Sequence, residues 1–133
     1  MDEQKSASPD KASQRIMVVD DEEKICLMLE RYLSIKGYEV RSVRRGEEAV
    51  ALSEVFEPGV VVLDLLMPGM NGIDTLKALK ASNHPPKVIM LSAADHEKVI
   101  EGAISLGADF YLCKPVQLVE LEKLINGFLP SKK

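Results

Sequence analysis

Five short apolar runs alternate with five segments of helical periodicity, and this alternation constrains the fold more than any other feature of the chain. The apolar runs, which are short and rich in aliphatic residues, cover residues 15–19, 38–43, 60–63, 87–91 and 109–113. The segments with apolar residues at helical spacing cover residues 22–36, 46–55, 73–81, 96–106 and 117–129. Strict alternation of strand and helix predicts a parallel sheet covered by helices on both faces and joined by right-handed crossovers.

Several single residues predict local details of these elements. Gly107 follows the fourth helical segment and suits the positive φ at which helices often end. Asp95 precedes the same segment and is expected to be its N-cap. In the second helical segment, Ala49, Leu52 and Val55 are expected to face the core.

Length and charge limit the kinds of protein that this chain can be. Its 133 residues predict one domain with a single buried core, over residues 15–129, and a net charge of −4 gives no basic surface for nucleic acid. Direct DNA binding by this chain is therefore not expected.

The apolar runs of the chain are too short to span a membrane. Residues 1–14 are polar, lack the apolar core of a signal peptide and predict a disordered leader, and residues 130–133 form a short tail.

The two cysteines have neither the spacing of metal ligands nor that of a redox motif. Cys26 and Cys113 are therefore expected to be reduced thiols, packed as small hydrophobic side chains in a cytoplasmic protein.

Polar residues stand at the carboxyl ends of four of the five predicted strands. Asp20 and Asp21 follow the first strand, Asp64 the third, Ser92 the fourth and Lys114 the fifth. A doubly wound sheet presents all these ends at one edge, where open α/β sheets bind ligands. If the strand order is 2-1-3-4-5, the first and third strands are neighbours, and their three carboxylates meet at the point where the strand order reverses.

This combination of residue types favours phosphoryl chemistry. Crowded carboxylates repel one another and favour a bound cation, and an oxygen-only ligand set without His or Cys favours Mg²⁺ before Ca²⁺. Lys114 supplies a cationic group and Ser92 a hydroxyl donor for phosphoryl oxygens. The set describes an aspartate that accepts a phosphoryl group. The chain has no glycine-rich loop that would hold a nucleotide phosphate.

Each of these residues, taken alone, has an ordinary structural explanation. Asp20 or Asp21 alone is most often a helix cap, Ser92 alone a turn hydroxyl, and Lys114 alone a solvated surface charge. Their joint occurrence at one sheet edge favours the functional interpretation.

Four stretches in the same order resemble the receiver domain of bacterial two-component response regulators. They read Ile-Met-Val-Val-Asp-Asp-Glu, Val-Val-Leu-Asp-Leu-Leu-Met-Pro-Gly-Met-Asn-Gly, Val-Ile-Met-Leu-Ser-Ala and Gly-Ala-Asp-Phe-Tyr-Leu-Cys-Lys-Pro. The resemblance implies a flavodoxin-like, doubly wound α/β fold with five parallel strands in the order 2-1-3-4-5 and five helices. It also implies that the domain is a signalling module, whose only catalysis is its own phosphorylation and dephosphorylation.

The same resemblance implies a role for each polar residue of the predicted site. Asp64 would accept a phosphoryl group from a sensor histidine kinase or a phosphotransfer protein. Asp20 and Asp21, with Asp64 and the backbone carbonyl of Leu66, would bind Mg²⁺. Lys114 and Ser92 would contact the phosphoryl group, and the bond between Lys114 and Pro115 would be cis.

A conformational switch is also implied by the resemblance. Tyr111 would turn inward as the hydroxyl of Ser92 moves to the phosphoryl group, and the fourth helix, fifth strand and fifth helix would form the output surface. A half-buried strand aromatic is an equally good explanation of Tyr111 without the resemblance. Leu66 and Ala94 offer no polar group that would direct water to the acyl phosphate, which is therefore expected not to be short-lived.

The resemblance leaves the partners general. They would include an unknown output domain or effector protein, and the chain is expected to be a monomer or a weak or phosphorylation-dependent dimer. Whether it is a stand-alone receiver or part of a longer protein stays open.

Two other functions are compatible with parts of the pattern. Phosphatases with an aspartate nucleophile carry Asp-x-Asp at the strand end, but the second position here is Leu66, and a chain of this length has no room for a cap insertion. The other alternative is a receiver-like binding module that never accepts a phosphoryl group.

Overall fold

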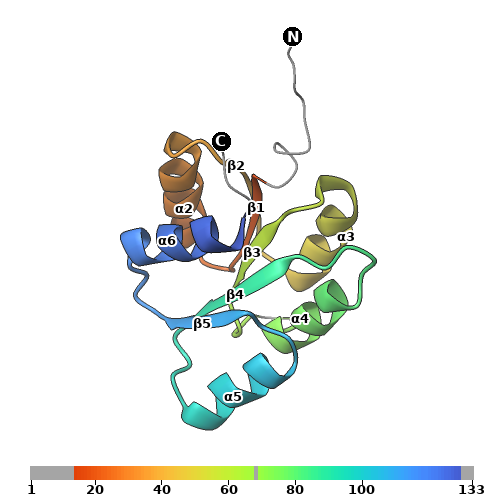
Figure 1. Cartoon of the computed structure of the whole chain (residues 1–133). Coiled ribbons are helices and arrows are strands. Elements are labelled where there is room, and N and C mark those ends of the chain that lie inside the picture. The colour runs from red at the N-terminus through yellow and green to blue at the C-terminus, as the bar shows by residue number, and fades with distance from the viewer. Residues whose placement is uncertain (1–13, 68, 130–133) are drawn as a thin grey trace.

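The computed structural model describes residues 14–67 and 69–129, and these form one five-stranded parallel sheet with helices on both faces (Figure 1). The strands are β1 Arg15–Val19, β2 Glu39–Val43, β3 Val60–Leu63, β4 Lys87–Ser92 and β5 Phe110–Cys113. The helices are α2 Glu23–Ile35, α3 Gly46–Phe56, α4 Gly72–Lys80, α5 Glu97–Ser105 and α6 Leu118–Phe128. The strand order is β2-β1-β3-β4-β5, which confirms the predicted fold class and topology.

The two predicted terminal segments lie almost wholly outside the described residues. Of the leader over residues 1–14 the structure describes only Gln14, and the tail at 130–133 is not described.

Two apolar layers enclose the sheet. α2 and α6 cover one face and α3, α4 and α5 the other (Figure 1). Because successive side chains of a strand point to opposite faces, Ile16 and Val18 pack into the first layer and Met17 and Val19 into the second. A strand buried on both faces must be apolar throughout, which explains why β3 reads Val-Val-Val-Leu.

The register of the sheet places the strand ends side by side. Val19 of β1 pairs with Leu63 of β3, and the N–H of Asp64 donates to the carbonyl of Val19 at 2.9 Å. Ser92 of β4 pairs with Cys113 of β5, and the N–H of Lys114 donates to the carbonyl of Ser92 at 2.8 Å. The residue that follows each strand therefore starts from the same edge of the sheet.

The core of α3 differs from its prediction. Val55 is 80% exposed, whereas Phe56 is 6% exposed. Phe56 continues the spacing of Ala49 and Leu52 along one face of the helix, and Val55 falls beside that face. The guanidinium of Arg41 lies 5.3 Å from the centre of the Phe56 ring.

The start of α5 differs from its prediction as well. The helix begins at Glu97, so the N-cap is His96 rather than Asp95, and His96 Nδ1 accepts the N–H of Lys98 at 3.3 Å. At the other end, Gly107 has a φ of 113°, which confirms its predicted role.

The prediction for the cysteines holds for one of the two. Both thiols are free, and Cys26 is buried, but Cys113 is exposed because it lies at the end of the edge strand β5. Within residues 14–67 and 69–129, no helix is both long enough and apolar enough to cross a membrane.

Candidate functional site

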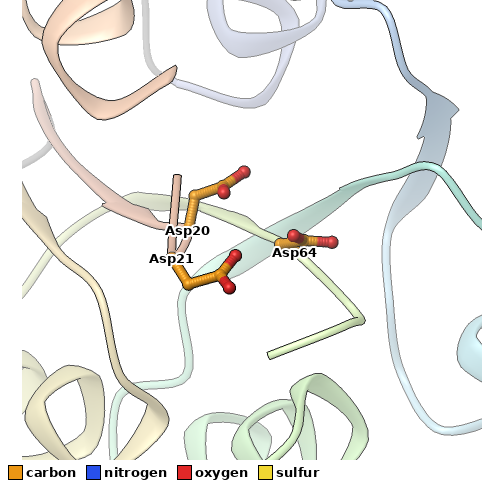
Figure 2. A group of neighbouring side chains, drawn as sticks. All are labelled: Asp20, Asp21 and Asp64. Atoms are coloured by element: carbon orange, nitrogen blue, oxygen red, sulfur yellow. The ribbon is translucent and has the colours of Figure 1, made fainter. Parts of the chain in front are cut away.

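Three carboxylates meet at the carboxyl edge of the sheet. Asp20 and Asp21 follow β1, and Asp64 follows β3, so their side chains project from neighbouring strand ends (Figure 2). One carboxylate oxygen from each lies within 4.8 Å of the others. Asp20 is 2% and Asp64 5% exposed, whereas Asp21 lies at the surface.

The two buried carboxylates are held in the same way. Asp20 Oδ1 accepts the N–H of Glu22 at 2.9 Å, and Asp64 Oδ1 accepts the N–H of Leu66 at 3.2 Å. β1 and β3 are therefore each followed by a turn in which the aspartate carboxylate accepts the backbone N–H of the residue two positions further along the chain. The second oxygen of each carboxylate, Oδ2, lies within 3.3 Å of Lys114 Nζ.

The loop after β3 packs tightly against the start of α4. The N–H of Gly72 donates to the carbonyl of Leu65 at 3.0 Å. A Cβ on residue 72 would lie 2.4 Å from the carbonyl oxygen of Asp64, so only glycine allows this approach. Gly72 thereby fixes the backbone that carries Asp64.

Lys114 brings an ammonium group from the end of β5 into this cluster. Its Nζ lies 3.0 Å from Asp20 Oδ2 and 3.3 Å from Asp64 Oδ2. It also lies 2.6 Å from Glu22 Oε1, which is the shortest of the three contacts. The peptide bond between Lys114 and Pro115 is cis.

Burial and charge shift the acid–base properties of two groups. Burial raises the pKa of Asp20 above its ordinary value, although the Glu22 N–H and Lys114 oppose that shift. Burial alone would lower the pKa of Lys114, but its hydrogen bonds to Glu22 and Asp20 outweigh burial and raise it. Lys114 is therefore a permanent cation at neutral pH.

The donor set fits a hard divalent cation. Its members are the carboxylate oxygens of Asp20, Asp21 and Asp64. The ammonium of Lys114 is shared by Asp20, Asp64 and Glu22. The proximity of Asp64 contributes to the raised pKa of Asp20, because two carboxylates so close together repel each other. Mg²⁺ sites in proteins are built from oxygen ligands, and the excess negative charge of the carboxylates here favours a bound cation.

Ser92 and Tyr111 meet at the loop between β4 and α5. Ser92 is fully buried, and its Oγ accepts the N–H of Ala94 at 3.2 Å. The hydroxyl of Tyr111 donates to the carbonyl of Ala94 at 2.5 Å. Burial of the half-buried Tyr111 ring raises its pKa, so the phenol stays a donor at neutral pH. Both predicted switch residues thus bind the backbone of the same residue.

One acid of this site, Glu22, has no specific role that the sequence predicts. In the structure, the side chain of Glu22 accepts a hydrogen bond from the ammonium of Lys114. The available signal was the run of three acids, Asp20-Asp21-Glu22, but the sequence alone does not show that Glu22 reaches the lysine together with Asp20. Leu66 is exposed beside Asp64, and its backbone carbonyl stays a predicted ligand.

Comparison with known proteins identifies the class that this fold and site define. The family model described as the response regulator receiver domain matches residues 16–126. The chain therefore belongs to the family of response regulator receiver domains.

Individual relatives agree with this assignment. The alkaline phosphatase synthesis transcriptional regulatory protein PhoP of Bacillus subtilis is 36% identical over 88% of this chain and 49% of its own length. The DNA-binding response regulator MtrA of Mycobacterium tuberculosis is 38% identical over 90% of this chain and 52% of its own length. The chain thus spans about half the length of these curated relatives.

Solved structures match over nearly their whole length. The chemotaxis protein CheY4 of Vibrio cholerae superposes with a TM-score of 0.83 at 27% identity, over 88% of this chain and 99% of that protein. The receiver domain of the Francisella response regulator 1452 gives a TM-score of 0.80 at 32% identity, over 86% of this chain and 94% of the domain.

Proposed function

We propose that Asp64 accepts a phosphoryl group from a sensor histidine kinase or a phosphotransfer protein in a Mg²⁺-dependent reaction. The observation that carries the proposal is the convergence of three carboxylates and the Lys114 ammonium at the neighbouring ends of β1, β3 and β5. Membership of the receiver family supports the same conclusion.

The transfer is an in-line displacement at phosphorus. A carboxylate oxygen of Asp64 attacks, the bond between phosphorus and the donor imidazole breaks, and the imidazole nitrogen leaves with the bonding electrons. Lys114 Nζ, 3.3 Å from Asp64 Oδ2, stabilises the negative charge on the transferred group. Mg²⁺, held by Asp20, Asp21, Asp64 and the Leu66 carbonyl, would supply further charge neutralisation.

Phosphorylation then switches the loop between β4 and α5. The new phosphoryl oxygens are strong acceptors, and they attract the Ser92 hydroxyl away from its present bond with the Ala94 N–H. Because Tyr111 binds the carbonyl of the same residue, a movement of this loop changes the environment of the Tyr111 ring. The signal reaches an output domain or effector protein through the surface of α5, β5 and α6.

The direct test combines a small phosphodonor with variants of single carboxylates. Wild-type protein incubated with acetyl phosphate and Mg²⁺ should gain the mass of one phosphoryl group in intact mass spectrometry. Asp64→Ala should lose this labelling, and chelation of Mg²⁺ should abolish it in the wild type. Asp95→Ala, a matched control at an exposed carboxylate outside the cluster, should be labelled like the wild type.

The same assay separates the alternatives. Stable labelling that depends on Mg²⁺ and on Asp64 supports the receiver function. Repeated turnover of a phosphomonoester would instead show a phosphatase. A protein that neither becomes labelled nor binds beryllofluoride would be an inert binding module, and the proposal would be wrong.

We further propose that residues 15–129 form the receiver domain of a cytoplasmic protein that is monomeric or weakly dimeric before phosphorylation. Sedimentation velocity with and without beryllofluoride tests the assembly state. A tight dimer of the unmodified protein would contradict this part of the proposal.

A further inference from the structure

Glu22 stands at the N-cap position of α2, yet its side chain does not cap the helix. No side-chain capping bond is made there, and Glu22 Oε1 instead accepts from Lys114 Nζ at 2.6 Å, across 92 positions of sequence. Glutamate is not among the favoured N-cap residues, whereas Ser, Thr, Asp and Asn are. This residue therefore makes a tertiary contact where helix formation alone would favour another side chain.

The contact closes a ring of hydrogen bonds around Asp20. Asp20 Oδ1 accepts the backbone N–H of Glu22 at 2.9 Å, and Asp20 Oδ2 lies 3.0 Å from Lys114 Nζ. Lys114 in turn donates to the Glu22 side chain. The ammonium has three protons and three carboxylate partners, and Asp64, at 3.3 Å, is the most distant.

The three partners of Lys114 differ in their relation to a metal ion. Asp20 and Asp64 belong to the carboxylate cluster, but Glu22 does not. A dication bound to that cluster repels the ammonium and competes with it for Asp20 and Asp64. The Glu22 carboxylate, whose side chain is 59% exposed, is the one partner of Lys114 among the described residues that stays free to hold it.

We propose that Glu22 is a positioning residue that retains the Lys114 ammonium beside Asp64 when a divalent cation occupies Asp20 and Asp64. The inference rests on the proposed function, because it concerns the same metal and phosphoryl site. Its consequence is that metal and ammonium bind together rather than displace each other, so that both are present when the phosphoryl group arrives.

Magnesium affinity measures this role without any phosphorylation. Isothermal titration calorimetry of Glu22→Gln should give a dissociation constant for Mg²⁺ about three- to fivefold higher than the wild type, the scale of a partly exposed ion pair. Glu23→Gln is the matched control, because it removes the same charge from the next residue, whose side chain pairs with Arg44 at 3.6 Å. It should change the affinity by less than about 1.5-fold. Equal affinities of the two variants would overturn the inference.

The same substitutions made in Lys114→Met protein test whether Glu22 affects Mg²⁺ binding through Lys114 or through its own charge. In Lys114→Met protein, Glu22→Gln should weaken Mg²⁺ binding no more than Glu23→Gln does. If Glu22 attracted the metal directly, the loss would be as large in this background or larger, and the proposed role would be wrong.

The outcomes also distinguish this inference from the proposed function. A wild-type protein without Mg²⁺ affinity would overturn both. A wild-type protein that binds Mg²⁺ and becomes phosphorylated on Asp64, with Glu22→Gln indistinguishable from Glu23→Gln, would overturn only the role of Glu22.

Discussion

Replacement of Gly72 by alanine should be the most damaging single-methyl change in the loop that carries Asp64. The new Cβ would lie 2.4 Å from the carbonyl oxygen of Asp64 and 2.4 Å from Leu65 Cα, whereas ordinary contact begins at 3.4 Å. The backbone must therefore move by about 1 Å, and both obstructing atoms belong to the main chain. Overpacking of this kind costs about 3 kcal/mol, which is a large part of a domain stability of roughly 5–15 kcal/mol.

A matched substitution in a helix should have the opposite sign. Gly102 lies inside α5, and a Cβ there would meet no atom within 4 Å. Gly102→Ala should therefore stabilise the protein by about 0.5–1 kcal/mol, because alanine loses less backbone entropy in a helix than glycine does.

Urea unfolding followed by far-ultraviolet circular dichroism measures both changes in a chain that has no tryptophan. Gly72→Ala should shift the midpoint to lower urea and Gly102→Ala to higher urea, at similar slopes. Under conditions where Gly72→Ala is folded, it should also be phosphorylated more slowly, because the displaced backbone carries Asp64. A loss of stability below about 1 kcal/mol in Gly72→Ala would refute the packing argument.

Three further predictions concern a partly buried hydrogen bond, the exposure of the two cysteines and the lifetime of the phosphoryl group. Asp109→Ala should destabilise the protein by about 1–3 kcal/mol in urea unfolding, because it removes the carboxylate that accepts the N–H of Val88 at 2.8 Å; an unchanged midpoint would contradict this. In the folded protein an alkylating reagent should modify Cys113 rapidly and Cys26 only on unfolding, since Cys26 is buried and burial raises the pKa of its thiol. Two equally fast thiols would be inconsistent with the structure. The acyl phosphate on Asp64 should hydrolyse over minutes or longer, and Leu66→Asn should shorten its half-life by offering a polar partner to the attacking water. A wild-type half-life of seconds would contradict this prediction.

The elements of this fold were predictable because they depend on local periodicity. Each strand and helix begins and ends within one residue of its predicted bounds, since apolar spacing and turn residues such as Gly107 act over a few positions. The composition of the site was predictable for a related reason. A parallel sheet brings the carboxyl ends of all its strands to one edge, so residues such as Asp20, Asp64 and Lys114 must gather there once the strands are assigned.

The tertiary structure alone decided which of several equivalent side chains makes each contact. Glu22 binds Lys114 across 92 positions, as Asp20 also does, and nothing in the local sequence shows which acids of the run Asp20-Asp21-Glu22 reach the lysine. Phe56 is buried in place of Val55, and Cys113 is exposed at the edge strand. Such choices depend on the packing of elements that are distant in sequence, whereas periodicity reports only which face of an element is apolar.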